Sequence, residues 1–176
     1  MQKILVIYST VDGQTKLICD RMHAIMCLEA NIEMVALERA GTVELNDYDK
    51  VLIGASIRYG KYRPQLFDFI ERNKELLASK YCGFFSVNVV ARKPNKNLPE
   101  TNPYMKAFVS QSPWQPQQLA VFAGRIDYPK YKWFDRTMIR FIMWMTKGPT
   151  DLAECYEFTD WQQVESFSKA FIDVKI

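Results

Sequence analysis

The stretch Tyr8-Ser9-Thr10-Val11-Asp12-Gly13-Gln14-Thr15 stands between a strand-like run and a helix-like stretch. The run before it, Ile4–Tyr8, is continuously apolar, as expected of a strand that is buried on both faces of a sheet. The stretch after it, Thr15–Ala30, repeats apolar residues at helical spacing. A junction of this kind, rich in small hydroxyl residues and glycine, predicts an anion site. The first N–H groups of a helix are free, and its dipole favours negative charge.

The junction carries neither G-x-G-x-x-G nor G-x-x-x-x-G-K-[ST], which disfavours a dinucleotide pyrophosphate and a nucleoside triphosphate. Its pattern resembles the FMN-phosphate loop of flavodoxins, with Tyr8, Thr10, Gly13 and Thr15 in the fixed places. The resemblance implies that one FMN binds through Ser9, Thr10, Asp12, Gly13, Gln14 and Thr15. Asp12 departs from the usual Thr or Ser, so we expect it to offer its backbone N–H or to cap the helix. The alternative is a capped helix without a ligand.

The rest of the chain alternates short apolar runs with longer amphipathic stretches. The next four strands of the sheet are expected at 32–37, 51–55, 81–87 and 119–123, a further short strand at 154–158, and helices at 64–77 and 101–110. The sequence Thr159-Asp160-Trp161-Gln162 reads as a capping box that opens a last helix. This alternation predicts a single α/β domain over residues 1–176, a doubly wound parallel sheet of five strands. We expect the flavodoxin-like order 2-1-3-4-5, with the ligand at the switch point beside the first strand.

Composition excludes several classes of function. The 176 residues are 48% hydrophobic and 24% charged, and the net charge of +3 is too small to argue for nucleic acid. No secretory signal is visible at the N-terminus, which favours a cytoplasmic protein. The four cysteines form no C-x-x-C pair and have no histidine cluster, so reduced thiols are expected and no metal site. The single histidine, His23, falls near the apolar face of the first helix, and we assign no general base.

Two further loops should flank a flavin ring in this fold. The first, Gly54–Gly60, has small residues that let backbone approach a flat ligand and Tyr59 to stack on it. The second, Ser86–Pro94, offers N–H groups to the polar edge of the flavin and has no aromatic residue, which leaves one flavin face open. Expected cofactor contacts are Ala55, Ser56, Ile57, Tyr59, Gly60, Ser86, Val87, Asn88 and Ala91. Arg58 or Arg92 could stabilise charge on reduced flavin; the alternatives are surface arginines and a turn with a buried tyrosine.

An insertion at 124–150, near the fifth strand, is surplus to the five-stranded fold. From Trp133 its spacing is helical, with Phe134, Met138, Phe141, Ile142 and Met145 on one side and Arg136, Arg140 and Lys147 on another. Aromatic and cationic faces together are typical of a helix that lies on an anionic membrane. Lys132, Arg136, Arg140, Phe141 and Trp144 are the expected membrane contacts. The alternative is that the apolar face packs on the core of the domain.

Three blocks carry a closer resemblance, at 53–60, 86–94 and 128–136, and Thr159-Asp160-Trp161 adds a weaker one. They resemble the flavodoxin-like, quinone-dependent protoporphyrinogen IX dehydrogenases of bacterial haem synthesis. The resemblance implies an oxidoreductase that converts protoporphyrinogen IX to protoporphyrin IX and passes electrons through FMN to a membrane quinone, menaquinone or ubiquinone. It places the protein peripherally on the cytoplasmic face of the inner membrane. Expected substrate or quinone contacts are Arg58, Arg92, Tyr128, Tyr131 and Trp133.

Three other readings stay open from the sequence. A one-electron flavodoxin carrier is typically strongly acidic, whereas this chain is mildly basic. An NAD(P)H-dependent quinone reductase would need to bind nicotinamide, for which no fingerprint is visible. A membrane-binding module with an empty site would bind no flavin at all.

Overall fold

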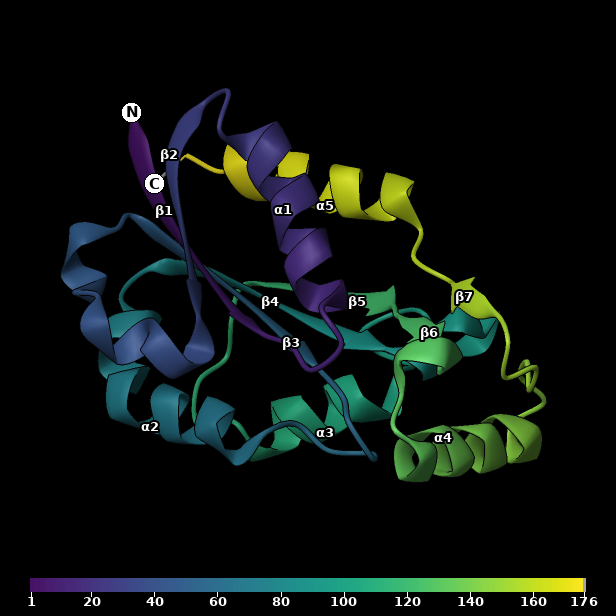
Figure 1. Cartoon of the computed structure of the whole chain (residues 1–176). Coiled ribbons are helices and arrows are strands. Elements are labelled where there is room, and N and C mark those ends of the chain that lie inside the picture. The colour runs from purple at the N-terminus through teal and green to yellow at the C-terminus, as the bar shows by residue number, and fades with distance from the viewer. Residues whose placement is uncertain (176) are drawn as a thin grey trace.

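The computed structural model describes residues 1–175, and its centre is a five-stranded parallel sheet (Figure 1). The strands are β1 (Gln2–Ser9), β2 (Ala30–Ala36), β3 (Lys50–Ser56), β4 (Tyr81–Asn88) and β5 (Gln118–Ala123). Their order is β2-β1-β3-β4-β5, which confirms the predicted topology. The helices are α1 (Gln14–Met26), α2 (Pro64–Ala78), α3 (Pro103–Gln111), α4 (Trp133–Met145) and α5 (Trp161–Asp173).

Two apolar cores lie on the two faces of the sheet. Helices α1 and α5 cover one face, and α2 and α3 cover the other (Figure 1). Along β1, Ile4 and Val6 point to the first core, whereas Leu5 and Ile7 point to the second. All four side chains are fully buried, because successive residues of a strand face opposite sides. This explains why the opening run of the sequence is apolar throughout.

The strand register brings three loops together at one edge of the sheet. Ser9 of β1 pairs with Ala55 of β3, and Ala55 pairs with Ser86 of β4. The chain therefore leaves β1, β3 and β4 at nearly the same level. Because the strand order reverses at β1, this edge is the switch point where ligands bind in open α/β sheets.

Two local predictions at helix ends are wrong. The first helix ends at Met26 and not at Ala30, because Ala30 already pairs with Gln2 as the start of β2. The last helix is capped by Asp160, whose carboxylate accepts a hydrogen bond from the Gln163 N–H at 3.2 Å. In the predicted capping box Thr159 held that place. The Thr159 hydroxyl instead donates to the Ala123 carbonyl at 2.8 Å.

The insertion is built on a small hairpin. Strand β6 (Arg125–Asp127) pairs antiparallel with β7 (Cys155–Glu157), so the hairpin carries the insertion past the predicted end at 150. Helix α4 begins at Trp133 as predicted and lies outside the two helix layers, near the carboxyl edge of the sheet (Figure 1). A separate small core of Ile126, Tyr128, Tyr131 and Met143 supports it.

The four cysteines are placed as follows. All four are free; Cys19 and Cys82 are buried, and Cys27 and Cys155 are exposed. Across residues 1–175 no group of three metal-ligating side chains comes together. In the same part of the chain, no helix combines the length and the apolar character needed to cross a bilayer.

Candidate functional site

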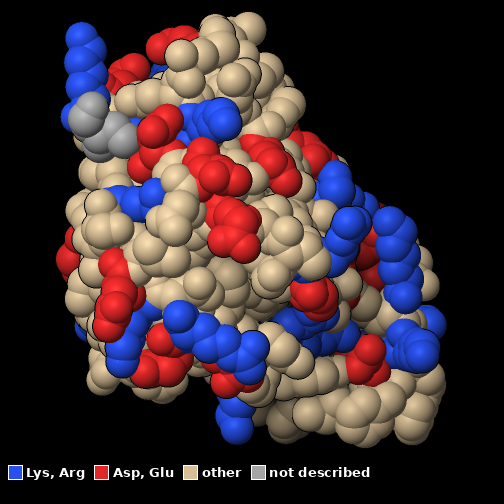
Figure 2. Space-filling view, turned by 90° about the vertical axis from the view of Figure 1, so that its left-hand side faces the viewer, with Lys and Arg blue, Asp and Glu red and all other residues tan. Residues whose placement is uncertain are grey.

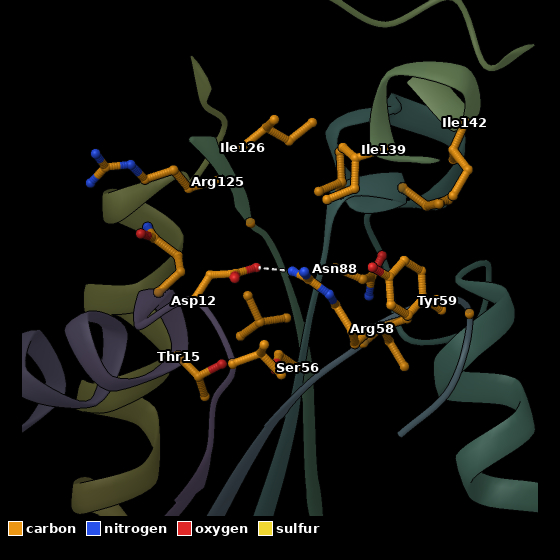
Figure 3. A pocket seen from close by; sticks show the side chains of 18 of the residues that line it. Asp12, Thr15, Ser56, Arg58, Tyr59, Asn88, Arg125, Ile126, Ile139 and Ile142 are labelled. Atoms are coloured by element: carbon orange, nitrogen blue, oxygen red, sulfur yellow. Dashed lines mark hydrogen bonds and ion pairs between the residues drawn. The ribbon is translucent and has the colours of Figure 1, made fainter. Parts of the chain in front are cut away.

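A cavity opens at the carboxyl edge of the sheet, and α4 forms its roof (Figure 3). Four segments line it: the loop after β1, the loop after β3, the loop after β4, and the insertion. In Figure 3, Asp12 and Thr15 stand on one side and Tyr59 on the other, with Arg58 between them and Ile139 and Ile142 above. The first three segments are those that the sequence predicted for a flavin.

The loop after β1 is shaped for an anion. Gly13 adopts a left-handed conformation with φ of 88°, which suits glycine, and its N–H donates to the Thr10 hydroxyl at 3.0 Å. Helix α1 begins directly afterwards, and within residues 1–175 no side chain caps it. The first hydrogen bond of the helix runs from the Leu17 N–H to the Gly13 carbonyl. The N–H groups of the first turn are therefore left for a ligand.

Two buried polar atoms in this loop have no hydrogen-bond partner among the described residues. They are Thr15 Oγ1 and Gln14 Oε1, and their residues are 0% and 6% exposed. Both residues line the cavity. A buried polar atom without a partner destabilises a protein by about 1–3 kcal/mol, so native proteins rarely keep one without a reason. The orphaned hydroxyl beside free helix N–H groups indicates a site for a phosphate.

Gln14 also fixes the loop to the insertion. Its Nε2 donates to the Glu157 carboxylate at 3.0 Å and to the Thr159 hydroxyl at 2.9 Å. The hairpin that carries α4 is thereby tied to the anion loop. Because the partners are more than 140 positions away, no local pattern in the sequence could have shown this link.

The loop after β3 is a tight two-residue turn. Arg58 and Lys61 exchange both backbone hydrogen bonds, at 3.0 and 3.1 Å. Tyr59 and Gly60 between them have φ of 50° and 79°, as a type I′ turn requires. A left-handed conformation is strained for tyrosine, and such strain gathers at functional sites. The Tyr59 ring is 46% exposed and stands at the cavity wall.

The loop after β4 is held by a buried polar network. The side-chain oxygen Oδ1 of Asn88 accepts a hydrogen bond from the Ala91 N–H at 3.0 Å and another from the Asn102 side-chain amide at 3.1 Å. The Asn88 amide donates to the Ser86 hydroxyl, which also accepts from the Tyr62 hydroxyl at 2.8 Å. Asn102 in turn caps α3. The network fixes the path of the backbone at 87–90, which lines the cavity.

The structure separates the predicted cofactor residues into two groups. Those that line the cavity are Thr10, Asp12, Gln14, Thr15, Ser56, Ile57, Tyr59, Gly60, Val87 and Asn88. Those outside the lining are Ser9, Gly13, Ala55, Ser86 and Ala91. The roles of Gly13, Ser86 and Ala91 are to shape the loops whose other members face the cavity.

The predicted substrate and quinone residues are also divided. Arg58 and Tyr131 line the cavity. Tyr128 is fully buried in the small core and donates to the Pro149 carbonyl at 2.8 Å. Arg92 donates to the Val89 and Thr146 carbonyls and so holds the end of α4. Trp133 is 77% exposed on the outside of α4.

Some lining residues were missed from the sequence. They are Val11, Val89, Val90, Tyr104, Gly124, Arg125, Ile126, Ile139, Ile142 and Met143. Ile139 and Met143 form a narrow inward strip on α4, and the wide apolar face of the same helix conceals that strip in the sequence. Tyr104 and Arg125 carry no signal, because only the tertiary fold brings them to the cavity.

The fold and the cavity define a flavodoxin-type protein. A family model described as "Flavodoxin domain" matches residues 5–153, and the chain belongs to that family. Two solved structures share the fold at low identity. Oxidised Flavodoxin 1 from Bacillus cereus has a TM-score of 0.56 and 14% identity, covering 97% of both chains. Oxidised Flavodoxin 2 from the same organism has a TM-score of 0.55 and 17% identity, covering 96% of this chain and 97% of that one.

Curated relatives place the chain within one branch of this class, the protoporphyrinogen IX dehydrogenases (quinone). The protein of that name from Escherichia coli K12 is 40% identical over 168 residues, which is 95% of this chain and 93% of the relative. A protein of the same name from Leishmania major is 41% identical over 171 residues, covering 96% of this chain and 74% of the relative. These relatives confirm the resemblance seen in the sequence.

Proposed function

We propose that this protein binds one FMN and oxidises protoporphyrinogen IX to protoporphyrin IX, passing the electrons to a membrane quinone. The names of the curated relatives support the substrate and the acceptor. The observation that best supports FMN as the cofactor is the Thr15 hydroxyl, which has no hydrogen-bond partner among the described residues. It lies at the start of α1, inside the loop that matches the flavodoxin pattern. The proposal includes a peripheral position on the cytoplasmic face of the inner membrane.

The residues at the cavity fit FMN. Thr10, Gln14, Thr15 and the free N–H groups of α1 would hold the phosphate, and Gly13 lets the loop turn around it. The ring would lie between the turn at 58–61 and the backbone at 87–90. When bound, FMN supplies the hydride and electron transfer, while the protein binds and orients.

The chain itself contributes apolar side chains and one arginine to the cavity. Ile126, Ile139 and Met143 give the roof an apolar lining that keeps water from the reacting centre. Arg58 brings a positive charge to the same cavity. Burial raises the pKa of the Tyr131 phenol to about 12, so Tyr131 is a neutral ring at physiological pH.

An anaerobic assay tests the reaction. Purified protein is mixed with protoporphyrinogen IX and either menaquinone or ubiquinone, and porphyrin fluorescence is followed. The proposal predicts turnover that needs quinone and does not need NAD(P)H. Flavin reduction by NAD(P)H alone would favour a quinone reductase, and FMN without porphyrinogen turnover would favour an electron carrier. Protein that takes up no FMN would be a binding module.

The outer face of α4 supports a membrane contact. Trp133, Phe134 and Trp144 are 77%, 62% and 69% exposed, and Phe141 and Met145 are more than half exposed. The apolar face is therefore not packed on the core of the domain, which was the alternative reading. Lys132, just before α4, and Arg140 within it are exposed as well. Grouped aromatic and cationic side chains on one helix suit the interface of an anionic bilayer.

One other face of the molecule gives a contrast. Figure 2 shows another side of the molecule, on which Lys and Arg side chains are interspersed with Asp and Glu. A mixed surface of this kind gives no large field of a single sign. The exposed aromatic side chains of α4 thus mark the insertion as the surface that would meet lipid.

Sedimentation with vesicles tests this contact. We expect wild-type protein to bind vesicles that contain anionic phospholipid, and the double variant Phe141→Ser/Trp144→Ser to bind at least about tenfold more weakly, because two large apolar side chains no longer enter the interface. High salt should weaken wild-type binding by screening the cations. The control is Leu28→Ser, since Leu28 is 78% exposed in the turn between α1 and β2, at the opposite edge of the sheet from α4, and should not contact the membrane with it. Equal binding of the double variant and wild type would remove the membrane assignment.

A further inference from the structure

Arg58 sits in a cage at the mouth of the cavity. Its Nη1 contacts the Asp12 carboxylate at 2.6 Å, and its Nη2 contacts the Asp135 carboxylate at 3.0 Å. The guanidinium also lies over two aromatic rings, 5.0 Å from the centroid of Tyr59 and 5.4 Å from that of Tyr131. Figure 3 shows Arg58 reaching from its strand end across the cavity toward Asp12. The two rings fix the Arg58 side chain, and each of its two terminal nitrogens pairs with a carboxylate.

Among the three charged side chains of this cluster, the two aspartates are more accessible than the arginine. The Arg58 side chain is 19% exposed, whereas Asp12 and Asp135 are 37% and 30% exposed. Asp12 belongs to the anion loop and Asp135 to the first turn of α4. One arginine thus faces two negative charges on different segments, which leaves one negative charge in excess. Exchange of one aspartate for another carboxylate would keep the number of ion pairs on Arg58 unchanged.

Asp135 is also the link between α4 and the turn at 58–61. Besides Arg58, its carboxylate accepts a hydrogen bond from the Tyr59 hydroxyl. Met143 is the only residue of α4 that is fully buried in the part of the chain described. The Asp135 contacts therefore tie the first turn of α4 to the turn at 58–61, and their loss would remove that tie.

We propose that Arg58 binds a carboxylate of the substrate in exchange for Asp135, so that entry of the substrate releases the first turn of α4. The inference rests on the proposed function, in which the substrate is a tetrapyrrole with propionate side chains. The guanidinium fork matches a carboxylate in two-point geometry. Tyr59 and Tyr131 beside it offer ring surfaces to the flat body of such a ligand.

Equilibrium binding of the product to FMN-loaded protein tests the exchange. The probes are protoporphyrin IX and its dimethyl ester, which differ only in the two carboxylates, and binding is read from porphyrin fluorescence. Arg58→Gln should bind the free acid about 10- to 100-fold more weakly and the ester unchanged, because a charge-assisted pair is lost. Arg58→Lys should retain part of the preference. Asp135→Asn should bind the free acid about two- to fivefold more tightly, because the Asp135 carboxylate no longer competes for Arg58 and a partly exposed ion pair of this kind is weak.

Controls separate this role from others. Arg63→Gln removes an arginine that pairs with Glu38 outside the cavity, and both probes should bind as to wild type. Because Arg58 belongs to the turn that flanks the FMN site, all probe binding is measured at saturating FMN, and the flavin content of Arg58→Gln is determined beside wild type. If Arg58→Gln keeps the preference for the free acid, or if it loses FMN instead, the inference is overturned.

The proposed function is judged by a different readout. Wild-type protein that turns over protoporphyrinogen with quinone, while Arg58→Gln still prefers the free acid, would refute the carboxylate exchange alone. Wild-type protein that neither turns over protoporphyrinogen nor binds protoporphyrin would refute both. Hydrogen exchange of the 136–139 amides, the first that donate hydrogen bonds in α4, should be faster with protoporphyrin IX than with the ester if α4 is released.

Discussion

Replacement of Thr15 by valine should weaken FMN binding by about 10- to 100-fold and leave the FMN-free protein equally stable or up to about 3 kcal/mol more stable. The two effects have one cause. Thr15 Oγ1 is buried without a hydrogen-bond partner in the described structure. The hydroxyl therefore destabilises the FMN-free protein and gains a partner only when an anion binds. Valine keeps the shape of threonine and lacks the polar atom.

The measurement pairs two titrations. FMN affinity is taken from the quenching of flavin fluorescence, and the free energy of unfolding from urea titration of FMN-free protein. Thr42→Val is a matched control, because Thr42 is exposed and its hydroxyl donates to the Arg39 carbonyl within the same turn. If Thr15→Val binds FMN like wild type, or if it is clearly less stable than wild type, the assignment of the hydroxyl to the phosphate site is wrong.

Replacement of Lys50 by methionine should have the opposite signature, with a loss of about 3–5 kcal/mol in the free energy of unfolding and unchanged FMN affinity. Lys50 is fully buried at the start of β3. Its ammonium donates to the carbonyls of Phe171, Ile172 and Val174 at 2.9, 3.0 and 2.6 Å, and so caps the end of α5. Methionine fills similar space but leaves these buried carbonyls without a donor.

Urea titration of FMN-free Lys50→Met measures the loss, and FMN affinity is measured in buffer where the variant is native. The site lies at the other end of β3, so binding should not change. Lys16→Met is the control; Lys16 forms an exposed pair with Asp20, worth less than about 1 kcal/mol. A loss below about 1 kcal/mol in Lys50→Met would show that the cap does not hold α5.

The fold was predictable because each element has a strong local signal. Strands buried on both faces must be apolar throughout, as in β1, and amphipathic helices must alternate with them. The errors lie where a tertiary contact decides. Alanine has no intrinsic preference that would end a helix, so the sequence does not show that α1 stops before Ala30. The pairing of Ala30 with Gln2 in the sheet decides it. Thr159 and Asp160 are both suitable N-cap residues. Because the Thr159 hydroxyl donates to the Ala123 carbonyl, Asp160 caps the helix instead.

The phosphate side of the site was predictable for the same reason, since Thr10, Gly13 and Thr15 act through local backbone geometry. The far side was not. Arg92 and Tyr128 satisfy carbonyls of the insertion, and whether a polar side chain meets a ligand or a distant backbone group depends on the packed chain. The cage of Arg58 likewise joins segments 46 and 77 positions away, at Asp12 and Asp135.

Comparison of FMN with riboflavin tests the central claim most directly, because riboflavin has the same ring and lacks the phosphate. Both are titrated into FMN-free wild-type protein under the same conditions. A phosphate held by the α1 N–H groups and Thr15 forms several charge-assisted hydrogen bonds, so FMN should bind at least about 1,000-fold more tightly than riboflavin. Equal affinity for the two flavins, or no binding of either, would contradict a phosphate site at the start of α1.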